Sequence, residues 1–298
     1  MKNILIIGCG LLGSSLLRRI SKKKIAKKIL VYEKSKSNIV KIKKLKLPGI
    51  IVKSLKDGVF NSDLIIFCTP MSEYKELILK INNFISPNTL ITDIGSSKIE
   101  SSKIIKKFLK KGINWIQSHP ITGSEVSGPE HGKDNIFENK WSIIIREKNT
   151  NKSNLNTLTK FWKKVGSKVV IMTNEKHDKI FSITSHLPHL IAYNLVKSAQ
   201  DFEKKQSYAL MKYSAGGLRD FSRIAASNEI MWRDIFFNNK NNISKAIDLF
   251  IKNLNEFKKD INSRNNKSIL KKLIQTKKVR SKIIKLKQDI DKPDFGRN

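Results

Sequence analysis

The sequence predicts an α/β protein: a doubly wound, mostly parallel sheet with helices on both faces, followed by an all-helical second domain. Apolar, β-branched runs of strand length alternate with helical patterns through the first half of the chain, as in such sheets. After Thr173 these runs stop, and helical periodicity continues almost without a break. We therefore expect a first domain at residues 1–173 and a second, helical domain at residues 174–298.

The expected strands are short apolar runs bounded by glycine, proline or polar residues. They are Asn3–Ile7, Ile29–Tyr32, Ile50–Val52, Leu64–Phe67, Thr89–Thr92 and Ile113–Gln117. Two more strands flank a helical pattern and are expected at the far edge of the same sheet: Trp141–Ile145 and Lys168–Met172. Asn174 is expected to cap the first helix of the second domain.

A net charge of +34 raises the question of a nucleic-acid or membrane partner. The distribution argues against one, because lysines are spread along the whole chain and the region 174–236 holds nine basic and seven acidic residues. We also find no nucleic-acid module and no apolar run of the roughly 20 residues that cross a membrane. Only two cysteines are present, which fits a reducing compartment and predicts a cytoplasmic protein.

A complete G-x-G-x-x-G motif directly follows the first expected strand, where a helix should begin. It consists of Gly8, Gly10 and Gly13 with Leu11 and Leu12 between them. At this position glycines let the backbone approach a pyrophosphate that lies on the helix N-terminus. The motif in this context predicts a Rossmann-type domain that binds a nicotinamide dinucleotide.

Glu33 ends the second expected strand, 20 residues after Gly13. An acid at this point can accept hydrogen bonds from both ribose hydroxyls and repel a 2′-phosphate, which favours NAD over NADP. Lys34 and Lys36 follow and can instead attract that phosphate, so NADP stays possible. Thr69 and Pro70 close the fourth strand where a cofactor crosses the sheet, although a simple strand end explains them equally well.

His119, within Ser118-His119-Pro120-Ile121-Thr122-Gly123-Ser124-Glu125, is the predicted catalytic base. A histidine held by a following proline can take the proton of an alcohol while hydride leaves for a bound nicotinamide. Ser96 follows the preceding strand. Because loops at the carboxyl edge of a parallel sheet converge, we expect Ser96 and His119 to meet the same substrate.

The helical half contains a second group of polar residues in Ser185-His186-Leu187-Pro188-His189. His186 and His189 are three positions apart, but no cysteine or carboxylate nearby completes a metal site, so no metal is expected. Pro188 is expected to kink the helix and free backbone groups. A kink among polar side chains indicates a pocket.

Arg223 lies one helical turn after Arg219 and three residues after Asp220, which can orient its guanidinium group. An inward arginine on an apolar helix requires an anion to offset its desolvation. Two interpretations remain open from the pattern alone: Arg223 binds an anionic substrate, or an internal Asp–Arg pair braces the domain.

Taken together, these motifs resemble the prephenate and arogenate (cyclohexadienyl) dehydrogenases of tyrosine biosynthesis. The resemblance rests on His119 to Glu125, on Ser185 to His189, and on Gly216 to Ala225 followed by Met231-Trp232-Arg233-Asp234. It extends to the tail at residues 293–297. Four separated motifs in the same order make the match specific.

The resemblance implies that His119 takes the proton of the ring hydroxyl and that Ser96 helps to position this hydroxyl. Arg223 would hold the ring carboxylate, and His189, with Ser185 nearby, would line the side-chain end of the pocket. Further family positions, with bracing, gating or dimer-contact roles, are matched by Glu125, Asp178, Asp220 and Trp232.

The expected reaction is the oxidative decarboxylation of prephenate, of arogenate or of both, with NAD as the hydride acceptor. A homodimer through the helical domain is also expected. One alternative is a reductase of the β-hydroxyacid or pyrroline-carboxylate type. The other is a protein that senses NAD(H) without turnover.

Overall fold

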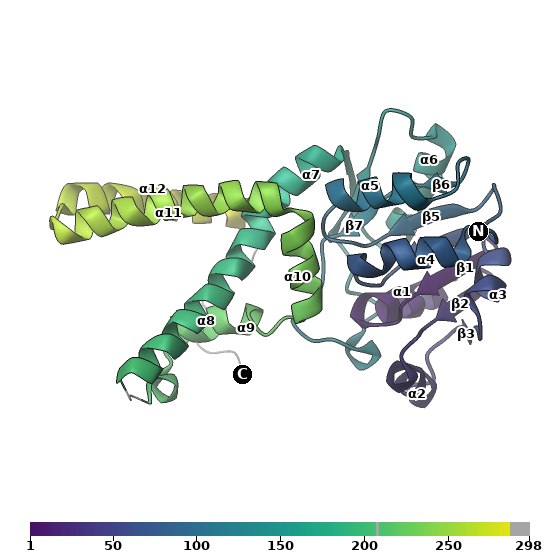
Figure 1. Ribbon diagram of the computed structural model, residues 1–298, viewed down its shortest axis with the longest axis horizontal. Helices are drawn as coiled ribbons and strands as arrows, with labels where there is room; N and C mark the ends of the chain where they lie inside the picture. Colours follow the sequence, from purple (N-terminus) through teal and green to yellow (C-terminus); the bar gives the residue numbers. More distant parts are fainter. Residues whose placement is uncertain (207–208, 287–298) are drawn as a thin grey trace.

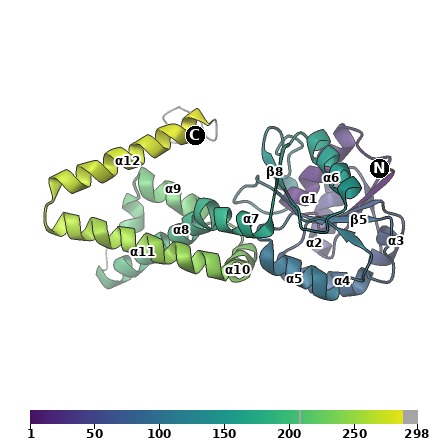
Figure 2. The ribbon, with the colours of Figure 1, turned by 90° about the horizontal axis from the view of Figure 1, so that it is seen from above.

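The computed structural model describes residues 1–206 and 209–286, so the tail at residues 293–297 lies outside the described residues. An α/β region with its core between sheet and helices forms one end of the molecule (Figure 1). Long helices project from this region and form the other end, as both views of the ribbon show (Figures 1 and 2). The expected fold class is confirmed.

The main sheet, within the described ranges, has six parallel strands in the order β3-β2-β1-β4-β5-β6. The strands are β1 (Asn3–Ile7), β2 (Lys28–Tyr32), β3 (Ile50–Ile51), β4 (Leu64–Phe67), β5 (Leu90–Asp93) and β6 (Asn114–Trp115). The strand order reverses between β1 and β4. Such a switch point is where doubly wound sheets bind nucleotides.

Helices cover both faces of this sheet because successive side chains of a strand point to opposite sides. Ile4 and Ile6 of β1 pack into a core with α1 (Leu11–Lys22) and α6 (Lys152–Val165). Leu5 and Ile7 pack into a second core, on the face of three other helices. These are α3 (Leu55–Phe60), α4 (Tyr74–Ile81) and α5 (Ile99–Phe108). The helix α2 (Lys36–Lys44) adds Ile42 to the first core, and the short turns η1 (Met71–Glu73) and η2 (Pro129–His131) lie in connections.

The prediction that residues 141–145 and 168–172 extend the main sheet is wrong. They form β8 (Trp141–Ile145) and β9 (Lys168–Met172) of a separate sheet, in which β7 (Ser118–Pro120) pairs antiparallel with β8. A parallel neighbour of β6 would need a crossover of a dozen or more residues. Only Ile116 and Gln117 separate β6 from β7, so β7 leaves the main sheet.

The helical half begins at Asn174, with Thr173 rather than the expected Asn174 as the cap, because the Thr173 hydroxyl accepts the Lys176 N–H. Its elements are α7 (Asn174–Phe181), the π-helical turn η3 (Ser182–His186), α8 (Leu187–Gln206), η4 (Leu210–Tyr213), α9 (Gly216–Ile224), α10 (Glu229–Asn238), α11 (Lys240–Asn262) and α12 (Asn266–Lys285). None of the described helices is long and apolar enough to cross a membrane.

Two elements of the helical half dock directly on the α/β region. Phe181 of α7 packs with Ile143 and Ile145 of the second sheet. Trp232 and Ile235 of α10 join the core on the α4 and α5 face. Beyond these contacts α8, α11 and α12 leave many large apolar side chains exposed, among them Phe202, Leu249, Leu254, Leu273 and Val279.

Candidate active site

The glycine loop after β1 is built for close backbone approach. Gly8 has a φ of +90°, and its N–H donates to the Tyr32 carbonyl at 2.8 Å. A Cβ at Gly13 would lie 2.1 Å from the Gly8 carbonyl oxygen, so only glycine fits where α1 crosses the loop. At Gly10, the N-terminal cap of α1, a Cβ would meet no described atom within 4 Å. This open side, at the positive end of α1, fits a pyrophosphate.

Glu33 lies beside this loop at the end of β2. Its carboxylate accepts the backbone N–H groups of Cys9 and Ser35, each at 2.8 Å. Lys34 pairs with Glu73, so its charge is partly compensated. The arrangement places a negative charge next to the loop and agrees with NAD as the cofactor.

Thr69 and Pro70 follow β4 at the same edge of the sheet. The Thr69 hydroxyl is buried and has no hydrogen-bond partner among the residues that the structure describes. A buried polar group of this kind calls for a partner. A hydroxyl or amide of a bound dinucleotide would supply one, so the residues present fit the cofactor.

His119 lies in the middle of β7, in the second sheet, and not at the end of a main-sheet strand as predicted. Polar contacts nevertheless hold β7 against the end of β5. The Ser118 hydroxyl bonds the Asp93 carbonyl at 2.8 Å, and the buried Lys98 ammonium donates to the Asp93 carboxylate and the Ser118 carbonyl, each at 2.7 Å. Ser96 lies in the same β5–α5 connection. Its expected role with the substrate hydroxyl stays a prediction.

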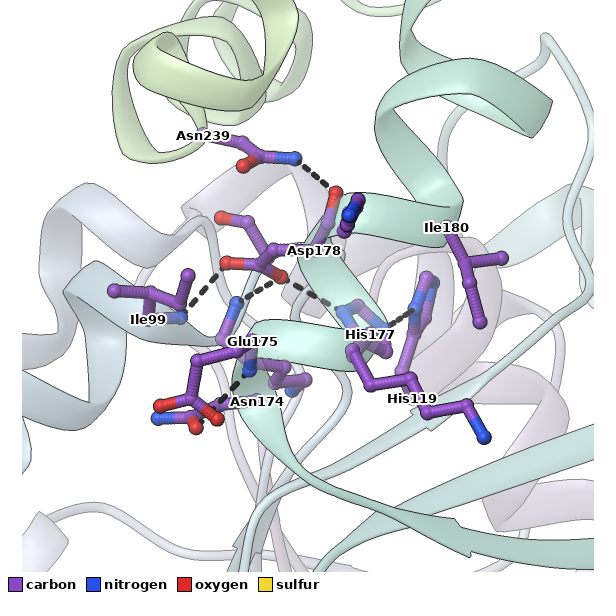
Figure 3. Close-up of polar contacts among 12 residues, drawn as sticks. Ile99, His119, Asn174, Glu175, His177, Asp178, Ile180 and Asn239 are labelled. Atoms are coloured by element: carbon purple, nitrogen blue, oxygen red, sulfur yellow. Dashed lines mark hydrogen bonds and ion pairs between the residues drawn. The ribbon is translucent and has the colours of Figure 1, made fainter.

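The His119 ring contacts a second histidine. Its Nδ1 lies 2.8 Å from Nε2 of His177, whose Nδ1 lies 2.7 Å from Oδ1 of Asp178 (Figure 3). Burial, reinforced by the electrostatic effects of His177, Lys98 and His186, holds the pKa of His119 well below its usual value. His119 is therefore neutral near pH 7, as a proton acceptor must be.

The sequence analysis missed His177 and Lys98 and assigned no definite role to Asp178. His177 and Asp178 lie near the start of α7, next to the expected domain boundary. One signal in the sequence could have indicated their role. His177 and Asp178 are adjacent in the first turns of a helix that follows the last strand of the expected first domain. The pairing with His119, 58 residues earlier, was not contained in any local pattern.

A π-helical turn lies directly before Pro188. The five residues of η3 adopt this wider turn before α8, which starts at Leu187. A π-turn frees backbone groups, is one of the features at which helices kink, and often occurs at functional sites, so the expected kink stays a prediction. The Ser185 carbonyl is bonded by His189 Nδ1 at 3.0 Å.

The two histidines of this segment have different neighbours. His186 is buried, and its Nδ1 lies 3.1 Å from the Asn239 amide nitrogen. His189 stacks on the Trp232 ring with a centroid distance of 3.8 Å. The indole nitrogen of buried Trp232 bonds to no other group within the described ranges. His189 and Trp232 thus form an aromatic wall beside the π-turn.

Arg223 is on α9, which has no buried residue in the part of the chain that the structure describes. Arg223 is therefore partly exposed in the single chain, and its role in binding an anionic substrate stays a prediction. Its guanidinium lies 3.3 Å from the Glu125 carboxylate, and both side chains are partly exposed. This contact joins α9 to the segment that follows His119. The proposed orienting role of Asp220 stays a prediction.

Arg223 and His119 each interact electrostatically with a histidine of the 185–189 segment. Besides burial, the charge of Arg223 lowers the pKa of His189, which stacks on Trp232. His186 contacts the edge of the same Trp232 ring and affects the pKa of His119. A dinucleotide loop, a neutral imidazole and a cationic binding group define the class of the protein, an NAD-dependent dehydrogenase.

The family follows from comparison with known proteins. Sequence models described as "Prephenate dehydrogenase, nucleotide-binding domain" and "Prephenate dehydrogenase, dimerization domain" match residues 16–171 and 173–276. The chain belongs to the prephenate dehydrogenase family. It is therefore an NAD-dependent enzyme, which decides against the two alternative functions.

Individual relatives agree with this assignment. The cyclohexadienyl dehydrogenase of Zymomonas mobilis is 30% identical over 97% of this chain and 98% of its own. The prephenate dehydrogenase of Bacillus subtilis is 32% identical over 86% of this chain and 69% of its own. The Aquifex aeolicus prephenate dehydrogenase, in its crystal structure with hydroxyphenyl propionate and NAD+, is 34% identical in sequence. The two structures superimpose with a TM-score of 0.88, and the match covers 95% of this chain and 98% of the other.

Alanine at Gly13 and at Gly10 should have different effects. In Gly13→Ala the new Cβ collides with the Gly8 carbonyl, so we expect a lower melting temperature and loss of NAD binding. In Gly10→Ala the protein itself has room, so we expect a near-normal melting temperature and at least tenfold weaker NAD binding. Thermal unfolding and calorimetric titration with NAD measure both. Equal NAD affinity of Gly10→Ala and wild type would contradict the placement of the pyrophosphate.

Proposed function

We propose that the protein oxidises and decarboxylates prephenate to 4-hydroxyphenylpyruvate with NAD. The observation that carries this proposal is the neutral His119 imidazole, held by His177 on Nδ1, together with the Arg223 guanidinium, which contacts Glu125 in the segment that follows His119. The names of the relatives support prephenate as the substrate. Arogenate, which differs by an amino group in place of a keto group, is tested beside it.

In this proposal His119 takes the proton of the ring hydroxyl at Nε2, because Nδ1 is occupied by His177. The bound NAD accepts the hydride from the carbon that carries this hydroxyl. Loss of the ring carboxylate as carbon dioxide leaves its electron pair in the ring and makes the ring aromatic. The protein therefore needs to orient the substrate and hold a base in its neutral form.

Arg223 and the aromatic wall supply the binding contacts in this scheme. The guanidinium of Arg223 binds the ring carboxylate, and Ser96 helps to position the hydroxyl. His189, stacked on Trp232, lines the pocket near Ser185. Glu125 braces Arg223, as their contact at 3.3 Å supports. Gly8, Gly10, Leu11, Leu12 and Gly13, with Glu33, Thr69 and Pro70, hold the dinucleotide.

We also propose that residues 1–173 and 174–298 are separate domains, that the second forms a homodimer, and that the protein is cytoplasmic. The change from strands to helices at Thr173 supports the boundary. The exposed apolar side chains of α8, α11 and α12 support a second copy as their partner. Both cysteines are free, which fits a reducing compartment.

His119→Asn tests the base and the reaction together. With prephenate and NAD the wild-type protein should produce reduced nicotinamide, followed by absorbance. The variant should lose about 10²- to 10⁴-fold in kcat, the range of general-base catalysis, because an amide cannot take the proton. NAD affinity should stay unchanged. Unaltered kcat would remove His119 as the base, and wild-type turnover of arogenate alone would correct the substrate.

Arg223→Gln should mainly raise KM for prephenate. Loss of a charge-assisted contact worth about 1.5–3 kcal/mol corresponds to a roughly 10- to 150-fold increase. Arg219→Gln, one turn earlier on the same exposed helix, serves as the control and should change KM less than twofold. If the Arg223 variant kept the wild-type KM, Arg223 would not bind the substrate carboxylate.

Glutamates at two exposed apolar positions of α11 test the homodimer. The wild-type chain should sediment with twice the mass of one chain. Leu249→Glu/Leu254→Glu should sediment as a single chain, since burying two carboxylates opposes association. Replacement of exposed Lys152 of α6 by Glu, outside the helical half, is the control for added negative charge. A wild-type monomer at micromolar concentration would refute the dimer.

A further inference from the structure

Three side chains from two regions of the chain form a linear array behind the catalytic imidazole. Asp178 Oδ1 contacts Nδ1 of His177 at 2.7 Å, and His177 Nε2 contacts Nδ1 of His119 at 2.8 Å (Figure 3). His177 and Asp178 are fully buried. The array contacts Nδ1 of His119, whereas Nε2 is the nitrogen proposed to take the substrate proton.

The Asp178 carboxylate is fixed as an acceptor at one end of this array. Its two oxygens accept the N–H groups of Lys98 and Ile99, each at 2.8 Å, at the N-terminus of α5. Burial raises the pKa of Asp178, whereas the two backbone donors and the positive end of the helix oppose this effect and favour a carboxylate that only accepts. Asn239 donates to the backbone carbonyl of Asp178 at 2.8 Å and fixes the start of the array from α11.

The direction of each hydrogen bond follows from this fixed acceptor. Because Asp178 only accepts, His177 must carry a proton on Nδ1. Burial, with the charges of Lys98 and His186, holds the pKa of His177 well below its usual value, so its Nε2 is unprotonated. This Nε2 can only accept, and His119 must therefore donate from Nδ1. A neutral His119 with its proton on Nδ1 has its lone pair on Nε2.

We propose that His177 and Asp178 are positioning residues that select the tautomer of His119 in which Nε2 is the base. This proposal rests on the function proposed above. When Nε2 takes the substrate proton, His119 becomes a cation whose Nδ1–H already points at a neutral acceptor backed by a carboxylate. The array thus orients the ring and stabilises the charge that forms during the reaction.

The groups around the array do not stabilise the positive charge that forms on His119, so the array itself must do so. Lys98 at the start of α5 and His186 of η3 are the other titratable groups that affect His119, and both disfavour its cationic form. Asp178 is the carboxylate within the array, and it contacts His177. A structural alternative exists, because the His177 ring also packs on Phe181 with a centroid distance of 4.5 Å.

Two substitutions of His177 separate these roles. His177→Phe keeps an aromatic ring beside Phe181 but removes both hydrogen bonds, so we expect kcat to fall about 10²- to 10³-fold with unchanged KM and NAD affinity. His177→Gln can place an amide oxygen near the Nε2 position and should recover at least tenfold of this loss. His131→Gln, an exposed histidine of η2, is the control and should keep wild-type kcat.

The tautomer of His119 is read directly by ¹⁵N NMR of the NAD complex. We expect a proton on Nδ1 in the wild-type protein and in His177→Gln, and on Nε2 in His177→Phe. A wild-type His119 protonated on Nε2, or a folded His177→Phe variant with wild-type kcat, would overturn the proposal. The NMR result needs no turnover. If prephenate is not the substrate, the assay of the wild type fails while the tautomer still depends on His177.

Discussion

The buried ammonium group of Lys98 is the contact on which the rest of the site depends. It joins the Asp93 carboxylate at the end of β5 to the Ser118 carbonyl of β7, and all three groups are inaccessible to solvent. The backbone N–H of the same residue donates to Asp178 of α7. One residue therefore connects the main sheet, the second sheet and the helical half. Burying such a pair is costly, and loss of one partner typically destabilises a protein by about 3–5 kcal/mol.

The two functional ends of the site are held by opposite means. His119 is enclosed by Phe181, His177 and strand β7, so its environment favours the neutral base. Arg223 is on a partly exposed helix, where its guanidinium lies 3.3 Å from the Glu125 carboxylate. A half-buried base and an accessible cation suit the proposed reaction, in which an anion must enter from solvent and a proton must be transferred away from bulk water.

Local signals predicted much of this arrangement. The glycine loop and Glu33 lie within one βαβ unit, where spacing alone determines position, and both are in the expected places. His119 was predicted from its proline and its neighbouring strand, although the strand belongs to another sheet. Sequence spacing could not reveal that sheet, because its β7–β8 pairing joins residues about 25 positions apart.

The missed features all depend on contacts between distant segments. Glu125 and Arg223 are 98 positions apart, and their contact requires α9 to lie beside the loop after β7. The π-turn before Pro188 was not predicted either, because a proline indicates a kink but not the wider turn, which lies against α11.

The uneven distribution of apolar burial sets an order for folding. The first core, with Ile4 and Ile6 of β1, consists of residues of the α/β region, which emerges first from the ribosome, whereas the second core also includes Trp232 and Ile235 of α10. The later helices α8, α11 and α12 leave apolar side chains exposed in the single chain. The homodimer proposed above would therefore form in a final bimolecular step whose rate rises with protein concentration.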